Sequence, residues 1–111
     1  MAPRHSMYDA TFTKKVSEEL VLSFDLTDWM DSGEYVASGP DAVAYNRETG
    51  LDVTADTLES SNDALDSDDT FWLYVQGGDD GDRLEIEIEW TTDADPAQNM
   101  KMVVLIHVDG P

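Results

Sequence analysis

The chain has 111 residues, the usual size of one domain, and carries 25 Asp and Glu against 6 Lys and Arg, a net charge of −19. No stretch has the excess of basic residues that attracts phosphates, so we expect neither nucleic acid nor an anionic membrane as a partner. Hydrophobic residues make up 41% of the chain and include 3 Trp, 4 Tyr and 3 Phe, which a wholly disordered chain would lack.

We expect an irregular arm at residues 1–10 and a single domain at residues 11–109. Strand-like sequence begins at Thr11, and over residues 19–26 apolar and polar side chains alternate. A period of two is typical of a half-buried strand. We then expect a turn at 28–33 and a short strand at 35–37. Ser38-Gly39-Pro40-Asp41 predicts a break in the chain's regular structure.

The middle third is predicted to hold three strands separated by turns and a loop. Short strands are expected at 42–45 and 51–58, on either side of a turn at 46–50. Residues 59–69 are acidic and polar, which indicates a loop. The run Thr70-Phe71-Trp72-Leu73-Tyr74-Val75 is aromatic and β-branched, the composition that strands prefer.

The last third contains the clearest alternation. After a Gly- and Asp-rich turn at 77–82, the apolar residues of 84–90 occupy one face and the three glutamates the other. A turn at 91–96 and a final strand at 100–108 complete the domain. About seven strands, frequent turns and no convincing helix predict an all-β fold, an antiparallel Ig-like β-sandwich.

The acidic residues are distributed along the whole chain, as 17 Asp and 8 Glu, rather than collected in a tail. Molar salt would screen their mutual repulsion and carboxylates would keep the surface hydrated, so we expect a protein of a halophilic organism's high-salt environment, with an ordinary mesophilic protein of acidic composition as the alternative. The chain has no Cys, which excludes a disulfide framework and a thiolate metal site. Residues 1–6 lead into no apolar run, so we expect no secretory signal and synthesis in the cytoplasm.

Two acidic loops are candidates for calcium, which needs several converging oxygen ligands. One contains Asp79, Asp80 and Asp82, and the other spans Asp63 to Asp69. Neither has the spacing of an EF-hand, and so acidic a composition produces such clusters by itself. We therefore favour solvated loops and expect no metal or other cofactor, with calcium as the alternative.

Catalytic constellations are poorly supported by the sequence, and we do not expect an enzyme. Asp25 and Asp28 beside Trp29 are the best carboxylate pair, but a turn or capping role suits them better. His5 and His107 are the only histidines and lie far apart in the sequence, which argues against zinc. No nucleophile elbow or phosphate-binding loop is present.

Partner contacts are expected from two groups of residues. Trp29 and Trp72, with Trp90 and Tyr74, form either part of the core or an exposed aromatic surface. Arg4, Lys14 and Lys15 are half of the basic residues of the chain and lie near its N-terminus. A basic arm of this kind suits docking onto an acidic neighbour, and a disordered terminus is the alternative.

Four segments resemble, in matching order, parts of the small Ig-like accessory proteins of tailed viruses, the fibre–tail adaptor or head–tail region type. Residues 19–30 are similar to their opening acidic strand with Asp and Trp, and 49–53 to a Gly-Leu-Thr-Val strand. Residues 72–81 resemble a Val-Trp-Leu-Ser-Gly-Gly hairpin, and 90–108 a Thr-Thr turn with the final strand. The sequence departs from the pattern at Pro96-Ala97, where the family has Gly-Arg, and in its more acidic residues 59–69.

The resemblance and the composition together imply a structural virion protein of a tailed virus of a halophilic archaeon. Its partners would be other virion proteins, and copies of it would form a homo-oligomer or a symmetric array. If the arm docks onto a neighbour, deletion of residues 1–12 should abolish incorporation without unfolding the sandwich. The alternative is an Ig-like binding module of a cell surface, stabilised by calcium, for which calcium would shift the melting temperature.

Overall fold

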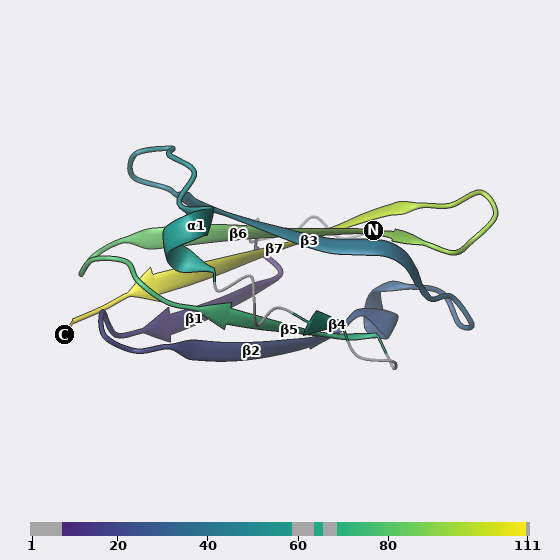
Figure 1. Ribbon diagram of the computed structural model, residues 1–111, viewed down its shortest axis with the longest axis horizontal. Coiled ribbons are helices and arrows are strands. Elements are labelled where there is room, and N and C mark those ends of the chain that lie inside the picture. Colours follow the sequence, from purple (N-terminus) through teal and green to yellow (C-terminus); the bar gives the residue numbers. More distant parts are fainter. Residues whose placement is uncertain (1–7, 59–63, 66–68, 111) are drawn as a thin grey trace.

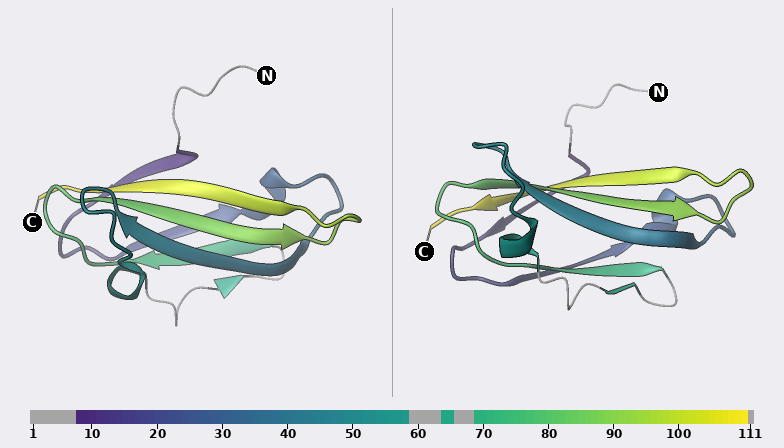
Figure 2. Two further views of the ribbon diagram at one scale, coloured as in Figure 1. Left: turned by 90° about the horizontal axis from the view of Figure 1, so that it is seen from above. Right: turned by 45° about the horizontal axis from the view of Figure 1, so that its top comes forward.

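Two β-sheets face each other in the computed structural model, which describes residues 8–58, 64–65 and 69–110 (Figure 1). One sheet has four strands in the order β1-β7-β6-β3, and the other has three in the order β2-β5-β4. Both layers are visible in the turned views (Figure 2). The prediction of an all-β sandwich is therefore confirmed. The strands are β1 (Ala10–Lys14), β2 (Leu20–Asp25), β3 (Val36–Asn46), β4 (Ala64–Leu65), β5 (Thr70–Val75), β6 (Arg83–Thr92) and β7 (Asn99–Val108).

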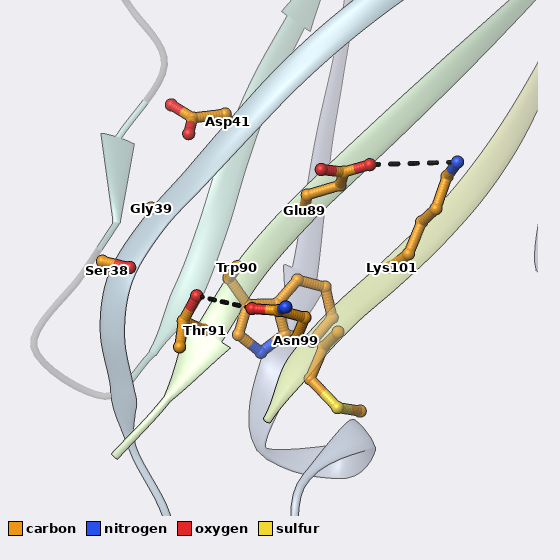
Figure 3. Close-up of a pocket in the computed structure, with 9 residues that line it drawn as sticks. Ser38, Gly39, Asp41, Glu89, Trp90, Thr91, Asn99 and Lys101 are labelled. Atoms are coloured by element: carbon orange, nitrogen blue, oxygen red, sulfur yellow. Dashed lines mark hydrogen bonds and ion pairs between the residues drawn. The ribbon is translucent and has the colours of Figure 1, made fainter. Parts of the chain in front are cut away.

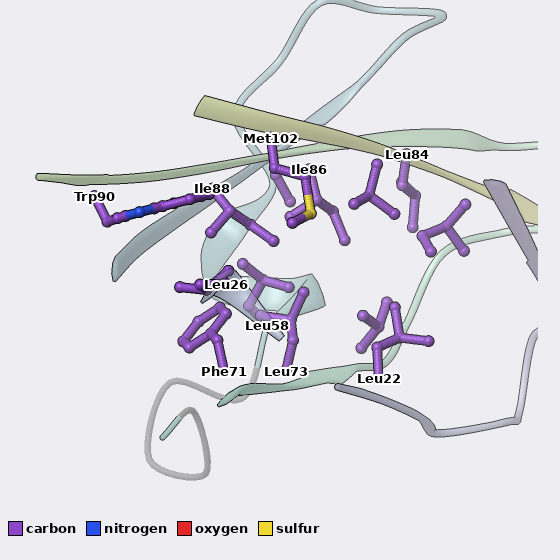
Figure 4. Packing of buried hydrophobic residues seen from close by; sticks show 14 of the residues in the cluster. Leu22, Leu26, Leu58, Phe71, Leu73, Leu84, Ile86, Ile88, Trp90 and Met102 are labelled. Atoms are coloured by element: carbon purple, nitrogen blue, oxygen red, sulfur yellow. The ribbon is translucent and has the colours of Figure 1, made fainter. Parts of the chain in front are cut away.

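The core lies between the sheets and is built from alternate residues of each long strand (Figure 4). On β6 the four apolar residues of the predicted alternation, Leu84 to Trp90, are all at most 3% exposed, whereas Glu89 faces solvent. Leu22 of β2 and Leu73 of β5 meet this layer from the other sheet. Removal of these apolar side chains from water is the main force that holds the sheets together.

The four-stranded sheet is mixed, because β1 runs parallel to β7 from Ala10↔Val104 to Lys14↔Val108. The prediction of an entirely antiparallel sandwich is wrong for this pair. Alternation within residues 10–14 indicates a strand but carries no information about the direction of its partner, which is more than 90 residues away in the sequence. The chain crosses from one sheet to the other between β1 and β2.

β3 is one continuous strand, although the sequence predicts two strands with a break at 38–41. The strand accommodates the Gly-Pro sequence through register shifts against β6, between Val36 and Ser38 and between Ser38 and Asp41. Gly39 has φ +88°, and a Cβ at this position would lie 2.9 Å from the carbonyl oxygen of Glu89. Glycine therefore allows the irregular strand to approach β6 rather than ending it.

Residues 51–58 form a turn with one short helix, α1 (Thr54–Thr57), instead of the predicted strand. The Asp52 carboxylate accepts hydrogen bonds from the Thr54 N–H (2.9 Å) and hydroxyl (2.6 Å), which bends the chain locally. The sequence also predicts a loop at 59–69, whereas Ala64–Leu65 pairs with β5 as β4. A single 3₁₀ turn, η1 (Leu26–Trp29), follows β2. Within the described ranges, no helix is long and apolar enough to cross a membrane.

The described chain is attached to the sheet earlier than the expected boundary at residue 10. The Asp9 N–H donates to the Val103 carbonyl and the Val103 N–H donates to the Asp9 carboxylate, both at 2.8 Å. β1 itself begins at Ala10. Of the expected arm, residues 1–7 lie outside the described chain, and Tyr8 and Asp9 contact the folded domain.

Candidate interaction surfaces

Lys14 is buried, which corrects the expectation that it contacts a partner. Its residue is 1% exposed, and its ammonium donates to the carbonyl oxygens of Lys15 (2.7 Å), Gly77 (2.7 Å) and Val16 (3.3 Å). Burial lowers the pKa of Lys14, with a smaller opposing effect from Glu18. The side chain therefore connects the end of β1 to the turn after β5 and has no surface to offer a second protein.

Of the other basic residues of the predicted contact, the structure describes one. Lys15 is exposed, and Arg4 lies outside the described residues. The first described residue, Tyr8, accepts a hydrogen bond from Arg47, whose Nη1 also lies 3.2 Å from the Glu85 carboxylate. The Arg47 guanidinium lies 5.7 Å from the centre of the Tyr8 ring. No local pattern predicts this contact, because Tyr8 and Arg47 are 39 residues apart.

The tryptophans do not form one exposed surface. Trp90 is 3% exposed in the core, and its ring makes an edge contact with that of Trp29 (centres 6.4 Å apart). Trp29 is half-buried against the core. Trp72 is half-buried on the opposite side of β5 from the buried Phe71 and Leu73. The two predicted contact residues, Trp29 and Trp72, thus belong to different parts of the molecule.

The outer face of the four-stranded sheet is acidic. Glu85, Glu87 and Glu89 alternate with the buried residues of β6. Lys101 on β7 lies 3.0 Å from the Glu87 carboxylate and 3.8 Å from that of Glu89. The hydrogen bond and charge of Glu87 raise the pKa of Lys101. Lys101, together with Arg47 beside Glu85, therefore compensates part of the charge of this row of carboxylates.

A hollow of about 400 Å³ lies where the irregular part of β3 passes β6 and β7 (Figure 3). The Thr91 hydroxyl there donates to the Asn99 side-chain oxygen (3.2 Å), and Lys101 lies beside Glu89. Neither contact joins a hydroxyl to a base that would activate it as a nucleophile. The hollow offers hydrogen-bonding groups for a polar contact, and its geometry provides no assembled catalytic pair. Its lining consists of Ser38, Gly39, Asp41, Glu89, Trp90, Thr91, Asn99, Met100 and Lys101.

Two of the calcium candidates after β5 accept hydrogen bonds from backbone N–H groups, Asp82 within its own turn and Asp80 from a residue that follows β7. The Asp82 carboxylate accepts from the Asp79 N–H, and the Asp80 carboxylate accepts from the Gly110 N–H, both at 2.8 Å. Within residues 8–58, 64–65 and 69–110, no three His, Cys, Asp or Glu side chains are grouped so that they could hold a metal ion. The candidates Asp63, Asp66 and Asp68, and His5, lie outside the described residues.

Two further carboxylates considered above support the backbone. Asp25 caps η1, accepting from the Thr27 N–H (3.1 Å) and hydroxyl (2.6 Å), as the predicted capping role requires. Asp69 is 6% exposed and accepts from the Val36 N–H (3.2 Å), which links the start of β5 to β3 in the other sheet. These contacts account for both residues without a catalytic role.

Comparison with known protein families, curated proteins and solved structures finds no match to the chain. The function is therefore inferred from the residues of this chain and from how the fold arranges them.

Proposed function

We propose that the domain is an Ig-like sandwich. In Ig-like domains, strands C, F and G form one sheet, and B, E and D belong to the other. With β2 to β7 taken as B to G, the orders β7-β6-β3 and β2-β5-β4 agree with this arrangement. β1 then lies beside the last strand, in the four-stranded sheet. This strand order supports the proposal independently of the sequence resemblance.

We propose further that the protein is a structural virion component of a tailed virus of a halophilic archaeon. It would join or decorate head, neck or tail components through protein–protein contacts. The observation that carries this proposal is the ordered resemblance. Three of its four segments fall on successive parts of the fold: 19–30 on β2 and η1, 72–81 on β5 and the following turn, and 90–108 on the end of β6 and on β7. The fourth, 49–53, falls on the turn between β3 and α1 instead of on the strand that the family pattern implies. The resemblance thus extends over both sheets rather than over one common hairpin.

The distribution of charge is compatible with assembly in concentrated salt. At about 1 M salt the Debye length falls to about 3 Å, so the carboxylates of Glu85, Glu87 and Glu89 no longer repel a neighbouring subunit at a distance. Sheet faces and edges can then approach other virion proteins. Symmetric repetition of modest contacts produces a stable particle.

Immunogold labelling of particles from a high-salt host culture tests this function. Antibody against the chain should label the neck, tail or capsid of intact particles, and pre-immune antibody should not. Label on cell envelopes, with none on particles, would contradict the virion role and favour a cell-surface binding module. Addition of calcium in a parallel melting experiment would then show whether that module is stabilised by the ion.

The basic arm is proposed as a second contact, through Arg4 and the exposed Lys15. The structure changes the test, because deletion of residues 1–12 would remove Ala10, Thr11 and Phe12 from β1. Deletion of residues 1–7 keeps this strand and the Asp9–Val103 hydrogen bonds. We expect the shortened protein to melt as the full chain does and to be missing from particles. Normal incorporation of the shortened protein would show that the arm makes no essential contact.

A further inference from the structure

β2 is the least protected edge of the sandwich. Proteins usually protect sheet edges with bulges, prolines, charges, short strands or covering segments. The edge of β3 is protected by its register shifts and by Pro40, and also by the following segment, in which the Val53 N–H donates to the Ala44 carbonyl. β4 has two residues. β2 runs for six residues in unbroken register with β5, and among the described residues no strand pairs with its other side.

The backbone groups at this edge can be identified from the register. The Leu26 N–H donates to the Asp69 carbonyl (3.0 Å), in line with the pairs Leu20↔Val75 to Asp25↔Thr70. Opposed residues of antiparallel strands alternate between hydrogen-bonded and non-hydrogen-bonded pairs. Leu22 and Phe24 therefore bond to β5. The N–H and C=O groups of Val21 and Ser23 point toward the open edge.

The middle of this edge carries no charged side chain, in contrast to the outer face of β6, and Asp25 is the charged residue at the end of the strand. Val21 is 47% exposed and Ser23 is exposed. Across the sheet they are opposed by Tyr74 and Trp72, which are also uncharged. β1, the edge strand on the other sheet, presents Thr11 and Thr13 to solvent instead of an apolar residue. β2 thus combines backbone groups that no described strand pairs with and an exposed apolar side chain.

We propose that β2 pairs antiparallel with β2 of a second copy of this chain, about a two-fold axis at Leu22. Val21 then lies opposite Ser23 of the second copy, and each such pair exchanges two hydrogen bonds. A second copy fits because both residues of each pair present their backbone groups outward in this register. The two three-stranded sheets become one continuous sheet. This proposal rests on the proposed function, because it assumes that the protein assembles through protein–protein contacts, and it names one of those contacts.

The charges at the ends of β2 make the pairing depend on salt. In the register centred on Leu22, Glu19 lies opposite Asp25 of the second copy. Like charges directly opposed across a strand pair are destabilising, in addition to the repulsion between two chains of −19 each. Molar salt screens both effects. We therefore expect dimers in concentrated salt and monomers after dilution of the salt.

Light scattering coupled to size exclusion, on the purified full chain, tests the proposal. In about 3 M KCl we expect a dimer that dissociates on dilution to roughly 0.2 M, with circular dichroism recorded throughout to identify folded samples. Ser23→Pro removes an N–H that faces the open edge and none that bonds to β5, so it should give a monomer. The matched control Ser23→Ala keeps that N–H and should remain dimeric.

Other outcomes would overturn the pairing. A folded monomer at every salt concentration excludes pairing between two copies. This holds even if β2 then proves to bind a strand of a different protein. A Ser23→Pro protein as dimeric as Ser23→Ala shows that the contact lies elsewhere. If Ser23→Pro does not fold, Val21→Pro decides in its place, because Val21 also directs its N–H to the open edge, and a folded dimer without that N–H would also exclude the pairing. If the protein is a monomer, the dimer proposal fails while labelled particles can still support the virion role. If particles carry no label, the virion role fails while light scattering can still show the dimer, so the two proposals fail separately.

Discussion

The two sheets share one core but meet the solvent differently. The four-stranded sheet has Glu85, Glu87 and Glu89 on its outer face, and its edge strand β1 is secured by the buried Lys14. On the three-stranded sheet, the outward positions of Val21 and Ser23 are uncharged, and the edge of β2 is open within the described chain. The middle of β2 therefore lacks the row of charges that covers β6, and the charges nearest to it are Glu19 and Asp25 at its two ends. This uncharged stretch is where contact with another protein costs the least desolvation.

Substitutions on the inner and outer sides of the sheets should differ most in their effect on the free energy of unfolding. Ile86 of β6 is 0% exposed, whereas Val21 of β2 is 47% exposed. Ile86→Ala should lower the free energy of unfolding by about 2–5 kcal/mol, because it removes apolar contacts and leaves a cavity. Val21→Ala should change it by less than about 0.5 kcal/mol. Urea denaturation in molar KCl, with both variants monomeric, measures the difference.

Equal effects of these two substitutions would contradict the division between core and surface. A large loss in Val21→Ala would mean that the outer side of β2 is covered even in the monomer. The comparison must be made at low protein concentration, because dimerisation through β2 would add to the apparent stability of the wild-type chain.

The attachment of β1 should depend on Lys14. Lys14→Met retains much of the apolar side chain and leaves the carbonyls of Lys15 and Gly77 without their donor. Unsatisfied buried polar groups cost about 1–3 kcal/mol, so we expect a loss of that size in the free energy of unfolding. Lys15→Met, at the exposed neighbouring position, is the control and should have little effect. Identical stability of both variants would show that the buried ammonium is not needed to hold β1.

The burial of Lys14 also predicts how the stability of the folded chain depends on pH. Its pKa is lowered from 10.5 by burial, so between the lowered value and 10.5 the unfolded chain binds more protons than the folded chain. Stability rises with pH wherever the unfolded state binds more protons. The wild-type chain should therefore gain stability relative to Lys14→Met as the pH rises through this window. A constant difference between the two unfolding curves would contradict the burial of the charged amine.

Local sequence patterns are sufficient to predict the strands at 70–75, 84–90 and 100–108, and alternation gives the inward positions on β6, because each pattern lies within a few residues. The parallel partner of β1 and the edge position of β2 depend on contacts between distant parts of the chain. The continuity of β3 depends on how closely Gly39 approaches Glu89, which the residue types alone present as a break. The residue type predicts a surface position for Lys14, since lysine is rarely buried without partners. Its partners are backbone carbonyls, for which the sequence offers no signal.

The smallest expected effect concerns the acidic face. Glu87 and Glu89 both lie within 4.0 Å of Lys101, so Lys101→Gln removes the cation that these two carboxylates share. Exposed ion pairs contribute about 0–1 kcal/mol, and we expect a loss within that range at low salt and none in molar salt. Lys15→Gln makes the same change of charge away from β6 and should show a smaller salt dependence. The two variants are compared by urea denaturation at several KCl concentrations.

The pH dependence of this pair has the opposite sign to that of Lys14. Because Glu87 raises the pKa of Lys101 above 10.5, the folded chain binds the proton more tightly than the unfolded chain. The stabilisation is present below 10.5 and is lost as the pH rises through the raised value. As the pH rises at low salt, the free energies of unfolding of the wild-type chain and Lys101→Gln should therefore become more alike. Over the same titration, the difference in free energy of unfolding between the wild-type chain and Lys14→Met should grow. If both pairs of curves moved in the same direction, the two lysines would not differ in environment as the structure requires.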